Sequence, residues 1–560
     1  SSDVCSSDLH FTGRSRRFHR VTGLGCHAGS GFGHRRIQAM LEQMRDVVLD
    51  LFQLIQVQVG VGDGEHLAGF WLLVNDGAPA LVDDLFLQRP VEAFGDAVGL
   101  RLGDEGKGSF VDAWVGRMQT PALVVRYNGG PQAAHHVVLP DGRWHCFAQL
   151  GAGMLQNQTE TLLSPYMLVE PLSLVREATH LADLGVGTPL LRTWVARRCV
   201  VVTPFHRLLG RLRELARGSA RHGSCGLGVG QAWLDSQNPS VPSLRVEDLL
   251  DRTTLSSKLR FLQLVNVDQA EQLLDGMSQP ISPACHAILA ELQQHSTVAQ
   301  LCEGYDHFRT SGVLFDDGSE LSRLLSDEDQ PILFEGAQGA LLDATFGFFP
   351  FVTPSCTRFD NALALLSGQP AQRIGLVRAY ATRHGPGPLV SEDPRLSDAL
   401  PEAHNLQNPW QGPMRVGFFD AVATRYALAF VGGIDRLAIG CLDRLVAQGP
   451  LKLCRAYRYL GPATTDVDDL FVRSSDGTIT DIRVPAQPTL TGQKKLGERL
   501  ALCQPIYDEL PAISATHSDD GRLSPDAQAY LSSILGALRL SDDQLGYVST
   551  GPTAKDKLWR

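Results

Sequence analysis

The sequence lacks any apolar run long enough to span a bilayer, and its cysteines form no closely spaced pairs. A transmembrane helix needs about 20 predominantly apolar residues, so the first absence disfavours a membrane partner. The 11 cysteines are an odd number and include no C-x-x-C pair. We therefore expect reduced thiols instead of a disulfide framework or a zinc site, and a cytoplasmic location.

Positive charge is also scarce. Lys and Arg together number 50 against 61 Asp and Glu, which gives a formal net charge of -11. A broad nucleic-acid surface needs an excess of basic residues, so we expect no nucleic-acid partner, although a local basic pocket for phosphates stays compatible with this balance. The chain has 560 residues, of which 43% are hydrophobic. That length fits one large α/β domain with satellites, or several domains.

The first 92 residues show no functional pattern that we recognise, and we treat them as an unassigned N-terminal segment. Residues 1–9 read SSDVCSSDL and resemble a translated sequencing adaptor, so an assembly artefact is our default interpretation. Arg14, Arg16, Arg17 and Arg20 imitate a transit peptide, which is the less favoured interpretation. No functional inference rests on this segment.

From residue 93 onward, the patterns of strands and helices alternate. An apolar stretch at 97–100 leads into a glycine-rich turn and a helix predicted for 109–118. Residues 246–330 predict a helical subdomain, and residues 451–459 and 478–484 alternate like antiparallel strands. We predict an α/β fold with a mostly parallel, doubly wound central sheet and small antiparallel elements. Such sheets bind ligands at the carboxyl ends of their strands.

The hexapeptide GDEGKG at residues 103–108 has the composition of a phosphate-binding turn. Its glycines let the backbone approach a ligand and present N–H groups to phosphate oxygens at the start of a helix. Lys107 supplies a positive charge, and Asp104 can bind Mg²⁺ or accept a proton. The spacing differs from the Walker A motif. Taken alone, these residues fit a solvated surface turn equally well.

Further motifs follow at intervals along the chain. They are RYNGG at 126–130 with His135 just beyond, FEGAQGALLD at 334–343, PFVT at 350–353, TRHGPGP at 382–388 and STGP at 549–552. Together with GDEGKG, and in this order, they resemble the adenylosuccinate synthetases over most of the chain. The combination of GDEGKG with FEGAQG is specific to that family.

The resemblance implies an adenylosuccinate synthetase-like, P-loop-related fold and a GTP-dependent ligase of purine nucleotide biosynthesis. Members of the family phosphorylate the 6-oxygen of IMP with GTP. The amine of aspartate then displaces the phosphate, which gives adenylosuccinate, GDP and phosphate. Mg²⁺ bridges the phosphates, as phosphoryl transfer generally requires. A homodimer is expected because the family's active site borrows from a second subunit.

The matching positions imply roles for individual residues. Asp104 corresponds to the base that deprotonates N1 of the purine, Lys107 to a phosphate contact, and His135 to the acid, with His136 as the alternative register. Asp104 and the carbonyl of Ala134 correspond to magnesium ligands. The implied nucleotide-binding residues are Gly103, Glu105, Gly106, Gly108, Asp443, Ser549, Gly551 and Pro552. The implied substrate-binding residues are Gln132, Ser224, Gln338, Thr353 and Arg415.

Some of these residues have plainer interpretations, and the sequence departs from the family where substrates are recognised. Gln338 and Thr353 could cap loops, and Asp443 could form an ion pair with Arg444. Cys441 stands where the family has a lysine before the guanine-binding Asp, which leaves the preference for GTP over ATP open.

The loops expected to bind IMP and aspartate also differ from the family. The loop at residues 223–228 keeps the Ser224 hydroxyl but lacks a second hydroxyl and an arginine. Members of the family hold the carboxylates of aspartate with a run of arginines, and only Arg415 remains at the corresponding positions of this sequence. Two carboxylates normally need several guanidinium partners, so the amine substrate is in doubt.

Four interpretations therefore stay open. The first is a ligase that makes adenylosuccinate, and the second is a paralogous ligase with the same phosphoryl transfer but a different amine or purine. The third is a non-catalytic nucleotide-binding protein. The joint retention of Asp104, Lys107, His135 and Gln338 argues against it. The fourth is a damaged or misassembled reading frame.

Overall fold

The computed structural model describes residues 94–560, apart from 157, 278–279, 327–329, 403–408 and 463–465. The described elements belong to one compact unit, Val82–Arg560. Our interpretation of residues 1–92 as an unassigned segment concerns residues that lie outside the described ones.

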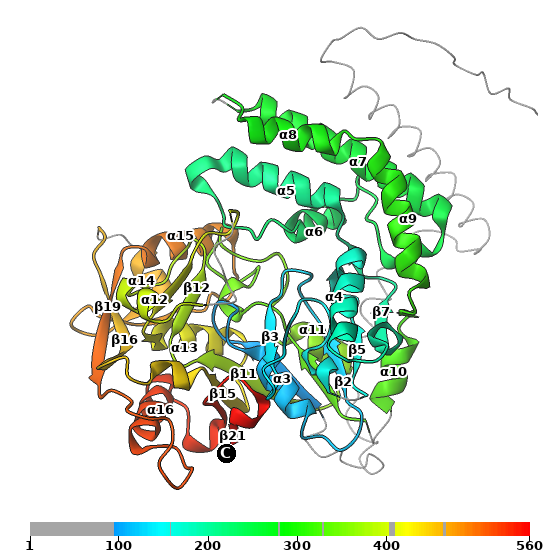
Figure 1. Ribbon diagram of the computed structural model, residues 1–560. Helices are drawn as coiled ribbons and strands as arrows, with labels where there is room; N and C mark the ends of the chain where they lie inside the picture. Colours follow the sequence, from blue (N-terminus) through cyan, green and yellow to red (C-terminus); the bar gives the residue numbers. More distant parts are fainter. Residues whose placement is uncertain (1–93, 157, 278–279, 327–329, 403–408, 463–465) are drawn as a thin grey trace, which may run out of the picture. The chain divides into compact units, whose positions relative to one another are not determined.

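A ten-stranded sheet forms the centre of this unit (Figure 1). Its strands are β1 (Phe94–Gly99), β2 (Leu123–Arg126), β5 (Glu160–Leu163), β7 (Thr193–Ala196), β9 (Leu314–Asp316), β10 (Ile332–Glu335), β11 (Gln372–Arg378), β15 (Arg436–Gly440), β20 (Leu545–Ser549) and β21 (Lys557–Trp559). Their order is β21-β20-β15-β11-β1-β10-β2-β5-β7-β9. Neighbouring strands run parallel except for the antiparallel edge pair β20 and β21. The predicted mostly parallel central sheet is confirmed.

The central strands are buried on both faces, which explains their continuous apolar sequence. In β2, Leu123 and Val125 pack into one apolar layer and Val124 packs into the other. Strands β10 and β15 divide their side chains between the two layers in the same way. Side chains alternate across a strand, and a parallel sheet is covered on both faces, so a polar alternation is not expected here.

Helices cover both faces, as the doubly wound prediction requires. One apolar layer contains side chains of α3 (Lys107–Val115), α4 (Pro171–Asp183) and α5 (Pro204–Arg217). The other contains side chains of α11 (Asp360–Leu366), α13 (Ala421–Phe430) and α16 (Pro525–Leu538).

The helix after the GDEGKG turn begins earlier than predicted. It starts at Lys107 because Gly106 adopts a φ of 83°, a left-handed conformation that glycine adopts without strain. It ends at Val115, before Gly116, so the expected range of 109–118 is shifted too far toward the C-terminus. The consequence for the site is that Lys107 lies in the first turn of the helix.

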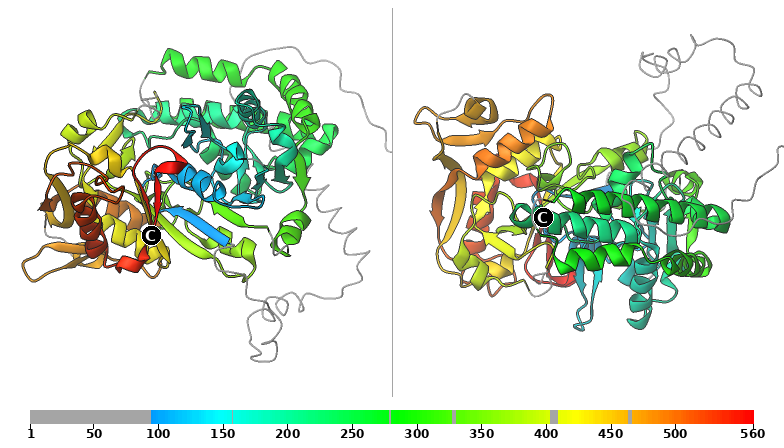
Figure 2. Two further views of the ribbon diagram at one scale, coloured as in Figure 1. Left: turned by 60° about the horizontal axis from the view of Figure 1, so that its bottom comes forward. Right: turned by 90° about the horizontal axis from the view of Figure 1, so that it is seen from above.

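Helices α7 (Arg252–Asp275), α8 (Pro283–Leu292), α9 (Ser296–Thr310) and α10 (Ser319–Ser326) lie within residues 246–330. Strand β9 of the same range joins the edge of the central sheet through β7. In Figures 1 and 2, α7, α8 and α9 (green) gather far from β16 (Leu451–Tyr459) and β19 (Cys503–Leu510).

Strand β16 pairs antiparallel with β18 (Ile479–Ile482) and with β19, which confirms the antiparallel elements expected near the C-terminus. The remaining strands and longer helices are β3 (His135–Val138), β4 (Trp144–Phe147), β6 (Leu168–Val169), β8 (Val200–Val201), β12 (Ala381–His384), β13 (Met414–Gly417), β14 (Phe419–Asp420), β17 (Phe471–Arg473), α6 (Val229–Gln237), α12 (Pro394–Ala399), α14 (Asp466–Leu470) and α15 (Leu490–Leu500).

Two general expectations can be compared with the structure. The cysteines of the described residues are all free thiols, as expected. Within the same residues, the helices are too short or too polar to cross a membrane.

The two-sided burial of β2 leads to a stability prediction. Leu123 is 0% exposed, whereas Leu490 is 61% exposed. Leu123→Ala should lower the free energy of unfolding by about 2–5 kcal/mol, because it removes buried methyl groups and leaves a cavity. The matched change Leu490→Ala should stay within about 0.5 kcal/mol of the wild type. Denaturant unfolding followed by circular dichroism measures both, and equal effects would contradict the assigned core.

Candidate functional site

Three loops meet where the neighbouring strands β1, β10 and β2 end. The parallel register of β1 with β10, and of β10 with β2, brings their carboxyl ends to one edge of the sheet. The loops are residues 100–106, 127–134 and 336–339, and each contains part of one motif, GDEGKG, RYNGG or FEGAQG, whose other residues lie in the adjoining helix or strand. A parallel α/β sheet binds ligands at this edge.

Lys107 joins two of these loops. Its Nζ donates to the carbonyl of Gln338 at 2.6 Å, to the carbonyl of Gly103 at 3.0 Å and to Oε2 of Glu105 at 3.1 Å. The side chain is 1% exposed. An ammonium group has three hydrogens, and each has a protein acceptor here. A phosphate contact by Lys107 therefore requires one of these acceptors to be exchanged.

Glu105 shapes the loop that carries Lys107. Its Oε1 accepts the backbone N–H of Arg101 at 3.2 Å and that of Gly103 at 2.9 Å, while Oε2 pairs with Lys107. The carboxylate is thus turned into the loop.

Two glycines allow the loops to approach each other. Gly103 has a φ of 110°, and a Cβ there would lie 3.3 Å from Cα of Gln338. A Cβ on Gly108 would lie 2.7 Å from Cβ of His135, which is closer than real Cβ atoms approach. Side chains at these positions would separate the GDEGKG turn from its two neighbours.

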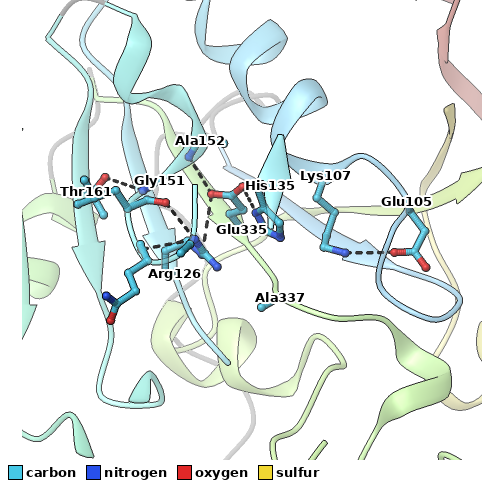
Figure 3. Close-up of polar contacts among 12 residues, drawn as sticks. Glu105, Lys107, Arg126, His135, Gly151, Ala152, Thr161, Glu335 and Ala337 are labelled. Carbon is cyan, nitrogen blue, oxygen red and sulfur yellow. Dashed lines mark hydrogen bonds and ion pairs between the residues drawn. The ribbon is translucent and has the colours of Figure 1, made fainter. Parts of the chain in front are cut away.

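His135 and Glu335 form the buried polar contact at the centre of the site (Figure 3). Nδ1 of His135 lies 2.6 Å from Oε1 of Glu335, and the other carboxylate oxygen accepts the N–H of Ala152 at 3.0 Å. Arg126 Nε lies 3.9 Å from the same carboxylate, and its Nη1 donates to the carbonyl of Leu150 at 2.9 Å. An ionised carboxylate only accepts hydrogen bonds, so Nδ1 carries the hydrogen and Nε2 is left as an acceptor.

The environment keeps this histidine neutral. Burial lowers the pKa of His135 to about 4, and the charges of Arg126 and Lys107 act in the same direction. Burial alone would raise the pKa of Glu335, but His135, Arg126 and the hydrogen bonds to the carboxylate hold it below its usual value. At neutral pH the site therefore contains a neutral imidazole and an ionised carboxylate.

Asp104 lies in the same loop, in a setting that makes its carboxylate more basic. Burial raises the pKa of Asp104, and the charges of Arg378 and Lys107 only partly oppose this effect. Arg378 donates to the backbone carbonyl of Asp104 and forms an ion pair with Glu402. A more basic carboxylate is better suited to accept a proton at neutral pH.

Asn128 fixes the RYNGG loop against the FEGAQG loop. Its Oδ1 accepts the N–H of Ala337 at 2.6 Å, and its Nδ2 donates to the carbonyls of Ala337 at 3.2 Å and Cys356 at 2.9 Å. Sequence reasoning gave no role to Asn128, Arg126 or Glu335, although all three lie inside motifs that it recognised. Arg378 was missed because it lies in β11, outside any motif.

Two predicted substrate residues have buried amides without hydrogen-bond partners among the described residues. They are Gln338, whose Oε1 and Nε2 are both unpaired, and Gln132, whose Oε1 is unpaired. Gln338 lies over Gly129, where a Cβ would be 3.3 Å from the amide, and Gln132 lies over Gly130. Buried polar atoms are rarely left unpaired. These unpaired amide atoms are consistent with the predicted binding of a polar ligand by Gln132 and Gln338.

The other predicted substrate residues make local contacts. Ser224 is exposed, and its Oγ accepts the N–H of Gly226 at 3.1 Å. The Oγ1 of Thr353 lies 3.4 Å from Oγ of Ser355. Ala134 is exposed and immediately precedes β3.

Arg415 is already paired inside the protein. Its Nε donates to Oε1 of Glu392 at 2.9 Å, and its Nη2 donates to the other oxygen of that carboxylate. Its Nη1 donates to the carbonyls of Gly385 at 3.1 Å and Gly387 at 2.8 Å. Both residues of the ion pair line a cavity of about 800 Å³. In this arrangement Arg415 does not offer a free two-pronged contact to a substrate carboxylate.

The residues expected to bind the guanine base also come together. Asp443 lies just beyond the end of β15, and Ser549 ends the neighbouring strand β20. Burial raises the pKa of Asp443. Among the described residues Asp443 forms no ion pair with Arg444, whose Nη2 donates to the carbonyl of Pro401 at 2.8 Å. Ser549 donates to the carbonyl of Gly551 at 2.9 Å.

The magnesium ligands suggested by the resemblance are sparse. The described residues contain no group of three or more His, Cys, Asp or Glu side chains that could hold a metal ion. Mg²⁺ is usually held by one or two carboxylates together with substrate phosphates and water. The single carboxylate of Asp104 is compatible with that pattern, and the carbonyl of Ala134 remains the second ligand that the resemblance implies.

Comparisons with known proteins identify the family and the fold. The family model described as adenylosuccinate synthetase matches residues 97–558. Adenylosuccinate synthetase of Cyanothece sp. is 32% identical over 74% of this chain and 82% of its own length. That of Syntrophus aciditrophicus is 31% identical over 78% and 91%. The structure of fully ligated adenylosuccinate synthetase from Plasmodium falciparum superposes with a TM-score of 0.66 at 19% identity, covering 84% of this chain and all of that one, and supports the fold.

The environment of His135 gives a prediction about pH. Its imidazole should titrate near pH 4 in the free folded protein and near pH 6.5 in the unfolded chain. Because the folded state disfavours the charged form, this contribution to stability is complete above pH 6.5 and is lost as the pH falls toward 4. NMR of ¹³C-labelled histidines, with His135→Gln used to assign the signal, measures the midpoint. A midpoint near 6.5 in the folded protein would show that burial does not control this group.

Proposed function

The chain belongs to the adenylosuccinate synthetase family, and we propose that it transfers the γ-phosphoryl group of GTP to the 6-oxygen of IMP. It then joins the amine of aspartate to carbon 6 of the purine. As a member of the family it is a GTP-dependent ligase of purine nucleotide biosynthesis that forms a C–N bond. The identities of IMP and aspartate, the site residues and their roles are our proposal.

One observation carries the proposal. Lys107 of the GDEGKG turn donates to the carbonyl of Gln338, and His135 contacts Glu335, so segments that are 200 or more residues apart meet at one edge of the sheet. Phosphoryl transfer depends on groups that hold phosphates and neutralise their charge at a fixed place. The helix start at Lys107 and the buried groups around it support such a role, because a helix N-terminus favours anions.

We assign the removal of the N1 proton of IMP to Asp104. Loss of this proton makes the 6-oxygen nucleophilic, and that oxygen attacks the γ-phosphorus while GDP leaves. The amine then attacks carbon 6, and phosphate departs with the former 6-oxygen. The raised pKa of Asp104 supports its assignment as the base, because a carboxylate with a higher proton affinity removes a proton more readily.

His135 contacts the transferring phosphoryl group in this proposal, and Glu335 positions its ring. The neutral imidazole presents Nε2 as an acceptor in the free protein. A phosphate anion nearby would favour the protonated form, because an opposite charge stabilises it. Nε2–H would then donate to the phosphoryl oxygens, while Nδ1–H stays on Glu335.

The remaining roles follow the family. Bound Mg²⁺, with Asp104 and the Ala134 carbonyl as its protein ligands, would neutralise charge on the phosphates. Gln132 and Gln338 are proposed to bind IMP through their unpaired amides, together with Ser224 and Thr353. Asp443, Ser549, Gly551 and Pro552 are proposed to bind the guanine base. A homodimer and a cytoplasmic location are proposed from the family alone.

The assignment of Asp104 predicts a specific loss of turnover. Asp104→Asn keeps the size of the side chain but removes the base, so kcat should fall about 10²–10⁴-fold. GTP-dependent phosphate release in the presence of IMP and aspartate measures the effect. Asp141→Asn is the control, because Asp141 lies on an exposed turn where its side chain is 52% exposed. Full turnover in Asp104→Asn would reject the proposed base.

A second candidate keeps the phosphoryl transfer but uses a different amine. The pairing of Arg415 with Glu392 favours it, because a guanidinium that is already neutralised binds a substrate carboxylate poorly. If aspartate is nevertheless the substrate, Glu392→Gln should release Arg415 and lower the KM for aspartate several-fold.

Glu498→Gln is the matched control for this change. Glu498 lines the same cavity but lies near Lys494, at 3.9 Å, instead of Arg415. Phosphate release should be measured with IMP, GTP and a series of amines. Release that responds to a neutral amino acid but not to aspartate, in both the wild type and Glu392→Gln, would establish the second candidate.

A further inference from the structure

The end of the chain folds back over the residues proposed to bind the guanine base. Strand β21 pairs antiparallel with β20, so that Lys557 lies opposite Ser549. The intervening loop contains Gly551 and Pro552, and the short helix η9 (Ala554–Asp556) leads into β21. Lys557 therefore enters the base site from a different element than Asp443.

Lys557 is buried and holds the loop in place. It is 4% exposed, and its Nζ donates to the carbonyls of Gly551 and Thr553, each at 2.9 Å. The same ammonium lies 5.7 Å from the ring centre of Phe110 in α3, the helix that begins at Lys107. The third ammonium hydrogen has no acceptor among the described residues, so it is available to a ligand.

Backbone pairing with Ser549 and the bond to Gly551 place Lys557 against the loop proposed to bind the base. Burial lowers the pKa of Lys557 to about 8, although the charges of Asp556, Cys441, Asp443 and Asp112 oppose this effect. The side chain is therefore still mostly protonated at neutral pH and acts as a donor. Cys441 is the position where the sequence lacks the lysine expected by resemblance.

The chemistry of the purine edge distinguishes the two groups. Guanine presents an acceptor at O6 and donors at N1 and at the exocyclic N2 amine, whereas adenine presents a donor amine at position 6. A carboxylate only accepts hydrogen bonds and an ammonium only donates them. A site that offers both the Asp443 carboxylate and the Lys557 ammonium to the base would therefore be complementary to guanine and mismatched to adenine.

We propose that Lys557 is a specificity-determining residue that donates its remaining hydrogen to O6 of the guanine base, beside Asp443, which accepts from N1 and N2. This inference rests on the proposed function, because it requires GTP to be the phosphoryl donor. In this arrangement, the cation that the base site lacks at Cys441 is supplied from β21. The preference for GTP over ATP is then retained without the lysine that the family has at the position of Cys441.

Two analogues separate the two contacts. In 6-thio-GTP a sulfur, which is a weak acceptor, replaces O6, whereas ITP keeps O6 but lacks the N2 amine. Equilibrium binding of GTP, 6-thio-GTP, ITP and ATP in the presence of Mg²⁺ and IMP should be measured for the full chain and for three variants. Lys557→Met removes the donor but keeps the stem, and Asp443→Asn removes the carboxylate. Lys555→Met is the control, because Lys555 is exposed on the same hairpin.

The wild type should bind GTP about tenfold or more tightly than 6-thio-GTP, because a hydrogen bond to a charged group is lost. Lys557→Met should bring the ratio of the affinities for GTP and 6-thio-GTP to about one and leave the ratio for GTP and ITP unchanged. Asp443→Asn should reduce the ratio of GTP to ITP, and Lys555→Met should change neither.

Two results would overturn the inference. The first is that the wild type binds 6-thio-GTP as tightly as GTP, a result that can be obtained without any variant. The second is that Lys557→Met weakens the binding of all four nucleotides equally, because loss of a lysine that only holds the loop would have that effect. If the wild type binds ATP but not GTP, the proposed function fails as well. If it binds GTP and only the ratio of the affinities for GTP and 6-thio-GTP differs from the expected value, the proposed function survives.

Discussion

The contact between the Lys107 ammonium and the carbonyl of Gln338 is the interaction on which the site depends. It closes the GDEGKG turn against the FEGAQG loop, and it exists because β1 and β10 are parallel neighbours whose ends meet. Glycine at position 103 permits the approach, and Asn128 holds the third loop against the second. The helix start at Lys107, the proposed base and the buried histidine are thereby brought into one place.

The residues proposed for phosphoryl transfer and those proposed for substrate recognition have different surroundings. Around Asp104 and His135, burial and nearby charges adjust proton affinities in ways that suit proton and phosphoryl transfer. In the region expected to bind the amine, Arg415 is neutralised by Glu392. At the proposed base site, Lys557 of the C-terminal strand contacts the loop at Gly551, while Cys441 occupies the position of the expected lysine. The phosphoryl-transfer chemistry is thus supported by more of the geometry than the identity of the amine.

The central sheet could be predicted from sequence because its strands are apolar on both faces and are followed by glycine-rich turns. The boundaries of α3 could not, because they depend on the backbone conformation of Gly106. Asp104 and His135 were recognisable from motifs, and their burial was not. The roles of Glu335, Glu392 and Lys557 could be assigned only from their contacts in the structure. The sequence alone does not show whether a charged residue faces water or a buried partner.

The central claim is that the 6-oxygen of the purine becomes an oxygen of the released phosphate. Turnover of IMP labelled with ¹⁸O at position 6, in the presence of GTP, Mg²⁺ and the amine, tests it directly by mass spectrometry of the phosphate. Phosphorylation of the 6-oxygen predicts one ¹⁸O in each phosphate formed with product. Unlabelled phosphate released together with the same product would contradict the account, because the oxygen would then have left the purine by another route.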